Sequence, residues 1–158
     1  EGLGKGQYIP HVIEPSAGVD RLILALISNA FQETTSTDDK GKSETRTVMK
    51  FHPRVAPVKV GIFPLLKNKP ELVAKAREVF QSLRGQVMAF YDDAGAIGRR
   101  YARQDEAGTP YCITVDGQSL TDRTVTIRDR DSLRQWRVKI DDCVSEISER
   151  VNAGPTGA

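Results

Sequence analysis

The chain has 158 residues, of which 39% are hydrophobic and 28% are charged. This balance is typical of a folded globular chain and excludes one that is disordered throughout. The formal net charge is only +2, so any binding to nucleic acid must depend on local arginine clusters. No apolar run approaches the roughly 20 residues that cross a membrane, and the N-terminus lacks a secretory signal pattern. We therefore expect a cytoplasmic protein that does not contact a membrane.

The first predicted elements are a strand and a helix. Residues 8–13 form a short apolar run that predicts a strand, and Pro15 and Gly18 end it. From Val19 onward apolar residues recur with a 3.6-residue period, which predicts a helix with one apolar face. That face must be covered by something else, because an apolar stripe on a helix is stable when it is packed.

Three polar side chains gather at the turn between this strand and this helix: Glu14, Ser16 and Arg21. A helix N-terminus has unpaired N–H groups and a partial positive charge. Arg21 in the first turn, beside the small Gly18, therefore predicts a phosphate site. In the simpler alternative, Ser16 caps the helix, and Glu14 and Arg21 form an ordinary surface pair.

The next stretch is polar and rich in turn residues. Residues 34–47, with the turn signal Asp38-Asp-Lys-Gly41, predict a surface loop or a hairpin, and residues 48–51 could return as a strand. Two prolines within residues 52–57 favour an extended connector. We place a domain boundary near Pro57.

From residue 58 the pattern changes to short strands that alternate with helices. Residues 58–63 predict a central strand, and a helix opens at Pro70 and ends at Gly85. Residues 87–91 predict the next strand. A strand, a helix and a strand at this spacing predict a right-handed parallel crossover.

The later elements complete an α/β fold class, with a mixed, mainly parallel sheet of about five strands flanked by helices. Cys112 and Cys143 lie in apolar surroundings without metal-ligand spacing, so we expect buried free thiols and no metal site. The predicted elements are a helix over 97–107 ended by Gly108, strands over 111–116, 124–128 and 135–140, a turn over 117–122, a last helix carrying Val144, Ile147 and Val151, and a frayed tail from Asn152.

A second candidate site lies on the helix that precedes Gly108. Arg99 and Arg103 are four residues apart and share one face, and Arg100 flanks it. Guanidinium groups in this arrangement could hold a phosphate backbone or a base edge. In the alternative, this is a solvated face that is neutralised by the carboxylates of residues 105 and 106.

A third basic stretch, Arg128-Asp-Arg-Asp-Ser-Leu-Arg134, alternates in sign. Its arginines could extend a surface that binds nucleic acid. They could equally belong to a turn between two strands that is locked by its own Arg–Asp pairs. Charge pattern alone does not separate these alternatives.

The run His11-Val-Ile-Glu-Pro-Ser-Ala-Gly-Val-Asp-Arg21 resembles the third signature motif of class II aminoacyl-tRNA synthetases, in the form found in dimeric glycyl-tRNA synthetases. The resemblance implies that Arg21, in a catalytic role, and Gly18 contact ATP. It also implies that Glu14 pairs with the glycine ammonium and that Ser16 helps to hold the amino acid. The chemistry agrees, because glycine has no side chain to read and must be selected through its charged ends in a cramped pocket.

The run Tyr91-Asp-Asp-Ala-Gly-Ala-Ile-Gly-Arg-Arg-Tyr-Ala-Arg-Gln-Asp-Glu-Ala-Gly-Thr-Pro110, followed by Thr124-Val-Thr-Ile-Arg-Asp-Arg-Asp131, resembles the C-terminal anticodon-binding domain of the same synthetases. In that family this α/β domain grips the anticodon stem-loop, whose splayed bases are read by hydrogen bonds and stacking. Carboxylates among the arginines suit glycine anticodons, which end in two cytosines, because a carboxylate accepts from a cytosine amino group. The implied anticodon-binding residues are Arg99, Arg100, Arg103, Asp105, Glu106, Arg128 and Arg130.

The resemblance covers roughly residues 8–150 and implies the C-terminal part of a glycine–tRNA ligase, which activates glycine with ATP and charges tRNA(Gly). ATP with Mg and a homodimer are implied for the full-length enzyme. The first two class II motifs have no counterpart, so we expect this chain alone to be inactive. The alternative is a non-catalytic accessory protein that binds nucleic acid through an anticodon-binding-type domain. The implied division is 1–33 as the end of a class II catalytic domain, 34–57 as a polar loop and linker, 58–151 as the anticodon-binding domain, and 152–158 as a disordered tail.

Overall fold

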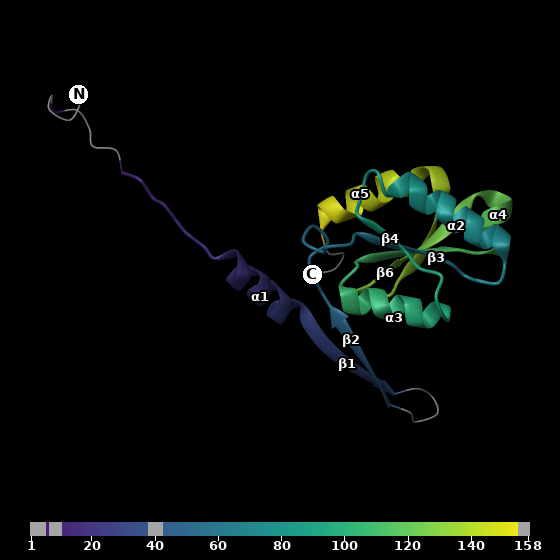
Figure 1. Cartoon of the computed structure of the whole chain (residues 1–158), viewed down its shortest axis with the longest axis horizontal. Coiled ribbons are helices and arrows are strands. Elements are labelled where there is room, and N and C mark those ends of the chain that lie inside the picture. The colour runs from purple at the N-terminus through teal and green to yellow at the C-terminus, as the bar shows by residue number, and fades with distance from the viewer. Residues whose placement is uncertain (1–5, 7–10, 38–42, 155–158) are drawn as a thin grey trace.

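The computed structural model describes residues 6, 11–37 and 43–154. Two regions follow one another along the chain (Figure 1). The first, here called the arm, consists of residues 11–18, helix α1 (Val19–Ala30) and an antiparallel hairpin of β1 (Phe31–Thr37) and β2 (Ser43–Met49). The second, here called the α/β domain, runs from residue 60 to residue 154. Figure 1 shows the arm extending away from the rounded α/β domain.

The α/β domain is built on one five-stranded mixed sheet, which confirms the predicted fold class. Its strand order is β4-β3-β5-β6-β7. The central β3 is parallel to both β4 and β5, whereas β5, β6 and β7 pair in antiparallel fashion. The strands are β3 (Val60–Pro64), β4 (Ala89–Tyr91), β5 (Tyr111–Val115), β6 (Thr124–Asp129) and β7 (Gln135–Lys139).

Helices cover both faces of this sheet (Figure 1). The chain passes from β3 through α2 (Pro70–Leu83) to β4 on one side, and from β4 through α3 (Ile97–Ala107) to β5 on the other side of β3. Right-handed crossovers in opposite directions place their helices on opposite faces. Accordingly, α3 lies on one face, and α2 shares the other with α4 (Gly117–Asp122), α5 (Cys143–Ala153) and the short 3-10 helix η2 (Ile140–Asp142).

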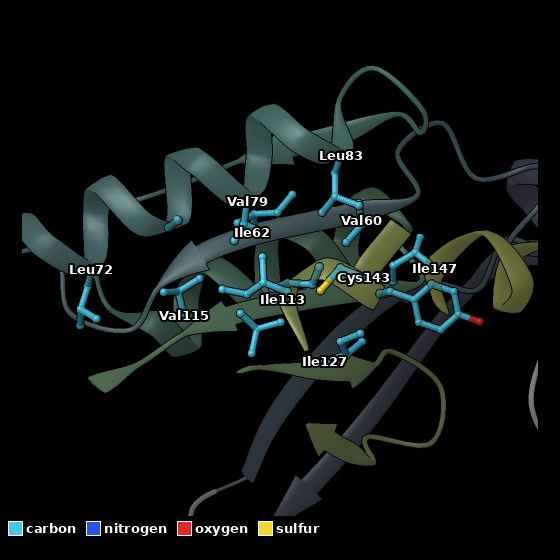
Figure 2. Close-up of a cluster of buried hydrophobic side chains, with 14 residues drawn as sticks. Val60, Ile62, Leu72, Val79, Leu83, Ile113, Val115, Ile127, Cys143 and Ile147 are labelled. Atoms are coloured by element: carbon cyan, nitrogen blue, oxygen red, sulfur yellow. The ribbon is translucent and has the colours of Figure 1, made fainter. Parts of the chain in front are cut away.

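The main hydrophobic core lies between the sheet and the helices α2 and α5 (Figure 2). Leu72, Val79 and Leu83 of α2 pack onto Ile62 and Ile113 of the sheet, and all of these side chains are buried. Burying one such side chain stabilises the fold by about 1.5–3 kcal/mol. Cys112 and Cys143 are buried free thiols, as predicted, and burial raises the pKa of each to about 12.

Local signals account for most of these elements. Helix α3 spans the predicted residues, and it ends at Gly108, whose φ of 81° is the left-handed conformation that glycine favours. The prediction of a turn over 117–122 is wrong, because this segment is α4. The Asp116 carboxylate accepts from the Ser119 N–H at 3.0 Å, and the Ser119 hydroxyl accepts from the Asp116 N–H, so a capping box starts the helix. The tail predicted from Asn152 is helical up to Ala153.

Two predictions for the arm are confirmed, and a third is wrong for the residues that the structure describes. Helix α1 begins at Val19 as predicted, and the polar stretch is a hairpin, one of the two alternatives. Residues 11–13 belong to no strand, and residues 8–10 of that predicted strand lie outside the described residues, as do the turn residues 38–42. The large apolar side chains of α1 are exposed, with Leu22 at 53% and Ile23 at 49%. Within the described chain, no element covers them.

The predicted extended connector over 52–57 is also wrong. The backbone N–H groups of Val55 and Ala56 both donate to the His52 carbonyl, which folds the segment into a tight turn. The Lys59 ammonium closes the turn by donating to the carbonyls of Pro53 at 3.0 Å and of Arg54 and Ala56 at 2.7 Å each. Burial lowers the pKa of Lys59.

Among the described residues, no helix is long and apolar enough to span a bilayer.

Candidate nucleic-acid interface

The four candidate residues in the arm are exposed and lie at the start of α1. Gly18 is the N-cap, with its carbonyl accepting from the Leu22 N–H at 3.1 Å, and no side chain caps the helix. The alternative in which Ser16 caps α1 is therefore wrong. Glu14 and Ser16 lie in the irregular segment before the helix, and Arg21 lies in its first turn. The described residues show no hydrogen bond or ion pair that draws these side chains into one site.

Arg100, predicted to contact RNA, is buried and connects the end of a strand to a loop. Only 1% of the residue is exposed, and its guanidinium donates to the carbonyl of Pro64, at the end of β3, and to that of Gly95 at 2.8 Å. Gly95 lies in the loop that follows β4. Arg100 therefore holds the loop after β4 against the end of β3, at the carboxyl edge of the parallel strands, which is where open α/β sheets bind ligands.

Arg99 and Arg103 lie on the exposed side of α3. Arg103 donates from Nε and Nη2 to one carboxylate oxygen of Asp92, at 3.1 and 2.5 Å, and from Nη2 to the carbonyl of Ala94 at 2.7 Å. Burial alone would raise the pKa of Asp92, but the hydrogen bonds and charge of Arg103, together with the Ala94 N–H and the charge of Arg100, outweigh it and the pKa is lowered. Two guanidinium groups are thus presented at the surface, and one of them is held in a fixed place.

Asp105 is the centre of a cluster of two arginines. Arg128 on β6 donates to both carboxylate oxygens, at 3.0 and 3.1 Å, and Arg46 on β2 donates to one of them at 3.1 and 2.6 Å. The Asp105 side chain is only 2% exposed. Burial lowers the pKa of Arg128, yet the Asp105 carboxylate outweighs this and the pKa is raised. The Arg128 guanidinium also lies 4.8 Å from the centroid of the Tyr101 ring.

Arg130 is likewise turned inward, with 2% of the residue exposed. Its guanidinium donates to the carbonyls of Met49 at 3.0 Å, Gly108 at 2.8 Å and Phe51 at 2.9 Å, and it pairs with Asp131 at 2.8 Å. Guanidinium is suited to this place because its five N–H donors satisfy several acceptors at once. The alternative of locked Arg–Asp pairs therefore holds for residues 130 and 131.

A polar cleft of about 450 Å³ opens between the hairpin and α3. Arg46 lines it and was not among the predicted residues, because its partner Asp105 is 59 positions away and no local pattern marks it. Gly98 and Ala102 are small residues on the α3 side of the cleft, beside the larger Tyr101, and Glu106 is exposed within it. The lining residues are Thr45, Arg46, Thr47, Gly98, Tyr101, Ala102, Asp105, Glu106 and Arg128.

The predicted anticodon residues thus fall into two groups. One group is buried and holds the structure together, and the other is exposed on one side of α3. The buried residues are Arg100, Asp105, Arg128 and Arg130, and the exposed residues, here called the α3 surface, are Arg99, Arg103 and Glu106.

The sheet, its flanking helices and this arginine-rich face together place the chain in a known class of domain. The chain belongs to the family described as the anticodon binding domain, which matches residues 59–150. Over more of its length, the chain is also similar to proteins named glycine–tRNA ligase. The relative from Rhodopirellula baltica is 59% identical over 147 residues, which cover 93% of this chain and 27% of that protein.

Two further glycine–tRNA ligases show the same relation. The protein from Thermobifida fusca is 49% identical over 92% of this chain and 31% of its own length. The protein from Methanococcus maripaludis strain C7 is 49% identical over 93% of this chain and 24% of its own length. The chain therefore spans about a quarter to a third of the length of these relatives, and the resemblance inferred from the sequence is confirmed.

Proposed function

We propose that this chain forms the anticodon-binding part of a glycine–tRNA ligase and carries one wall of its ATP and glycine site. One observation supports this most strongly. The similarity to the Rhodopirellula baltica ligase extends over 147 of the 158 residues, so at most 11 residues lie outside it and most of the arm is included. A domain that only binds nucleic acid has no need of that arm. The hypothesis that the chain is part of a ligase therefore accounts for more of its residues than the hypothesis of an accessory protein.

The proposed RNA-binding surface is the α3 surface together with the cleft beside it. Arg99 and Arg103 bring positive charge that suits phosphate and base edges. Glu106 is an exposed carboxylate that can accept from the amino group of a cytosine, and Arg46 in the same cleft is a donor for the acceptor atoms of that base. The buried Arg100, with the other buried arginines, acts indirectly in this proposal by holding the surface in place.

The proposed activation site uses the start of α1. Glu14 binds the glycine ammonium, Ser16 helps to hold the amino acid, and Arg21, with Gly18 beside it, contacts the ATP phosphates. The exposure of these residues in the arm supports this, because a ligand and further protein groups can reach them. In this proposal the remainder of a cytoplasmic ligase of the relatives' length would supply the other residues of the site. It would also bind Mg together with ATP and make the homodimer contacts.

The test is binding of the chain to an RNA hairpin with a glycine anticodon, followed by fluorescence anisotropy. We expect binding that weakens as salt is raised, because phosphate contacts release counterions. Replacing the two cytosines should weaken it, and Arg99→Gln with Arg103→Gln should cost about tenfold in affinity. Lys75→Gln is the matched control, since Lys75 is a basic residue on α2, on the other face of the sheet.

Equal affinity for the hairpins with and without the two cytosines would contradict the assigned surface. The same conclusion would follow if the Lys75 variant lost as much affinity as the α3 variant, because the binding would then be a general attraction to positive charge.

A further inference from the structure

Among the described residues, the arm meets the α/β domain at a junction that is here called the elbow. It consists of the Arg46–Asp105–Arg128 cluster and the contacts of Arg130 with the carbonyls of residues 49, 51 and 108. Arg46 belongs to the arm and Asp105 to α3, so this ion pair crosses the junction at 2.6 Å. The Arg130 contact with the Met49 carbonyl crosses the same junction, from the residue after β6 to the end of β2.

The elbow also packs closely. A Cβ atom at Gly108 would overlap the ring of Phe51, so the chain leaving β2 lies directly against the end of α3. Ala30 and Val48, at the base of the arm, are 3% and 2% exposed. The connector that follows is the tight turn closed by Lys59. A freely jointed linker would have none of these contacts.

We propose that the elbow holds the arm in one orientation relative to α3, with Asp105 and Arg130 as its positioning residues. Moving the arm would break charge-assisted hydrogen bonds between groups that are mostly removed from water. It would leave Asp105 facing a single arginine and would leave carbonyls at the end of β2 without their donor. Such groups are costly to leave unpaired, so one arrangement is favoured over the others.

The consequence rests on the proposed function. The residues proposed to read RNA lie on α3, and those proposed to bind glycine and ATP lie in the arm. Asp105 on α3 connects the two regions, because it lines the cleft beside the α3 surface and also binds Arg46 of the arm. A fixed elbow therefore keeps the two proposed sites at a set separation. A change at Asp105 in the cleft would also alter its ion pair with Arg46 at the base of the arm.

The test is a distance measurement between spin labels on the two regions. Asn29→Cys in α1 and Gln81→Cys in α2 provide exposed labelling sites, and the two native thiols are buried and stay unlabelled. Pulsed electron paramagnetic resonance of the parent should show a single narrow distance peak. Arg46→Gln should broaden or split that peak while circular dichroism shows the same helix content, and Lys75→Gln should leave the peak unchanged.

Asp105→Asn is the second variant, because it keeps the volume of the side chain and removes its charge. If Asp105→Asn unfolds, Arg46→Gln decides the matter, since it leaves the buried Asp105–Arg128 pair intact. A broad peak in the parent, or a narrow parent peak in every folded elbow variant, overturns the proposal. RNA binding is measured separately, so a chain with a rigid elbow that ignores the glycine anticodon refutes only the proposed function.

Discussion

Helices α1 and α2 make an instructive pair, because the same sequence pattern has opposite outcomes in them. Both have apolar residues at a 3.6-residue period, and both begin at the predicted residue. In α2, Leu72, Val79 and Leu83 are buried against the sheet, whereas in α1 Leu22 is 53% exposed. The period of a pattern therefore predicts a helix and the face that needs a partner, but it does not say which element of the described chain provides the partner.

The largest expected effect sharpens this contrast with one substitution made in each helix. Leu72→Ala should lower the free energy of unfolding by about 3 kcal/mol, because it removes a side chain that is 1% exposed and leaves a cavity. Leu22→Ala should change it by less than about 0.5 kcal/mol, since this side chain is already in water. Urea unfolding measures both. If Leu22→Ala cost as much as Leu72→Ala, α1 would have a partner in solution that is not among the described residues.

The sequence was most informative where structure depends on neighbours along the chain. Gly108 ends α3 at the predicted residue, and the strand, helix and strand around α2 form the predicted parallel crossover. It was least informative for the arginines. Arg100, Arg128 and Arg130 looked like a basic surface, but apart from the neighbouring Asp131 their acceptors come from residues 5 to 81 positions away. Only the folded chain shows which guanidinium groups are already occupied.

A smaller effect separates the elbow from an ordinary turn. Gly108 and Gly95 both have positive φ, at 81° and 74°, but only at Gly108 would a Cβ atom meet other groups, namely Phe51 and the Met49 carbonyl. We expect Gly108→Ala to cost about 2 kcal/mol and Gly95→Ala about 1 kcal/mol, because both are strained and one also disturbs the junction. Thermal unfolding of the two variants provides the measurement. Equal losses would mean that Phe51 yields freely and that the elbow is loosely packed.

The smallest expected effect concerns acid and lies entirely within the α/β domain. The hydrogen bonds from Arg137 hold the pKa of Asp116 below its usual value of 3.8, with further help from the cap of α4. Because the folded-state pKa is lowered, this carboxylate contributes stability above about pH 4 and loses it as the pH falls through the folded-state value.

Asp116→Asn should therefore cost about 1 kcal/mol at neutral pH, within the range known for helix caps, and the difference from the parent should shrink toward pH 3. Asp141→Asn is the control, because its ion pair with Arg123 is exposed on both sides and contributes little. The melting temperature as a function of pH measures both. A constant gap between Asp116→Asn and the parent from pH 7 to pH 3 would mean that α4 begins without the charge of its cap, and that the acid sensitivity of the α/β domain arises elsewhere.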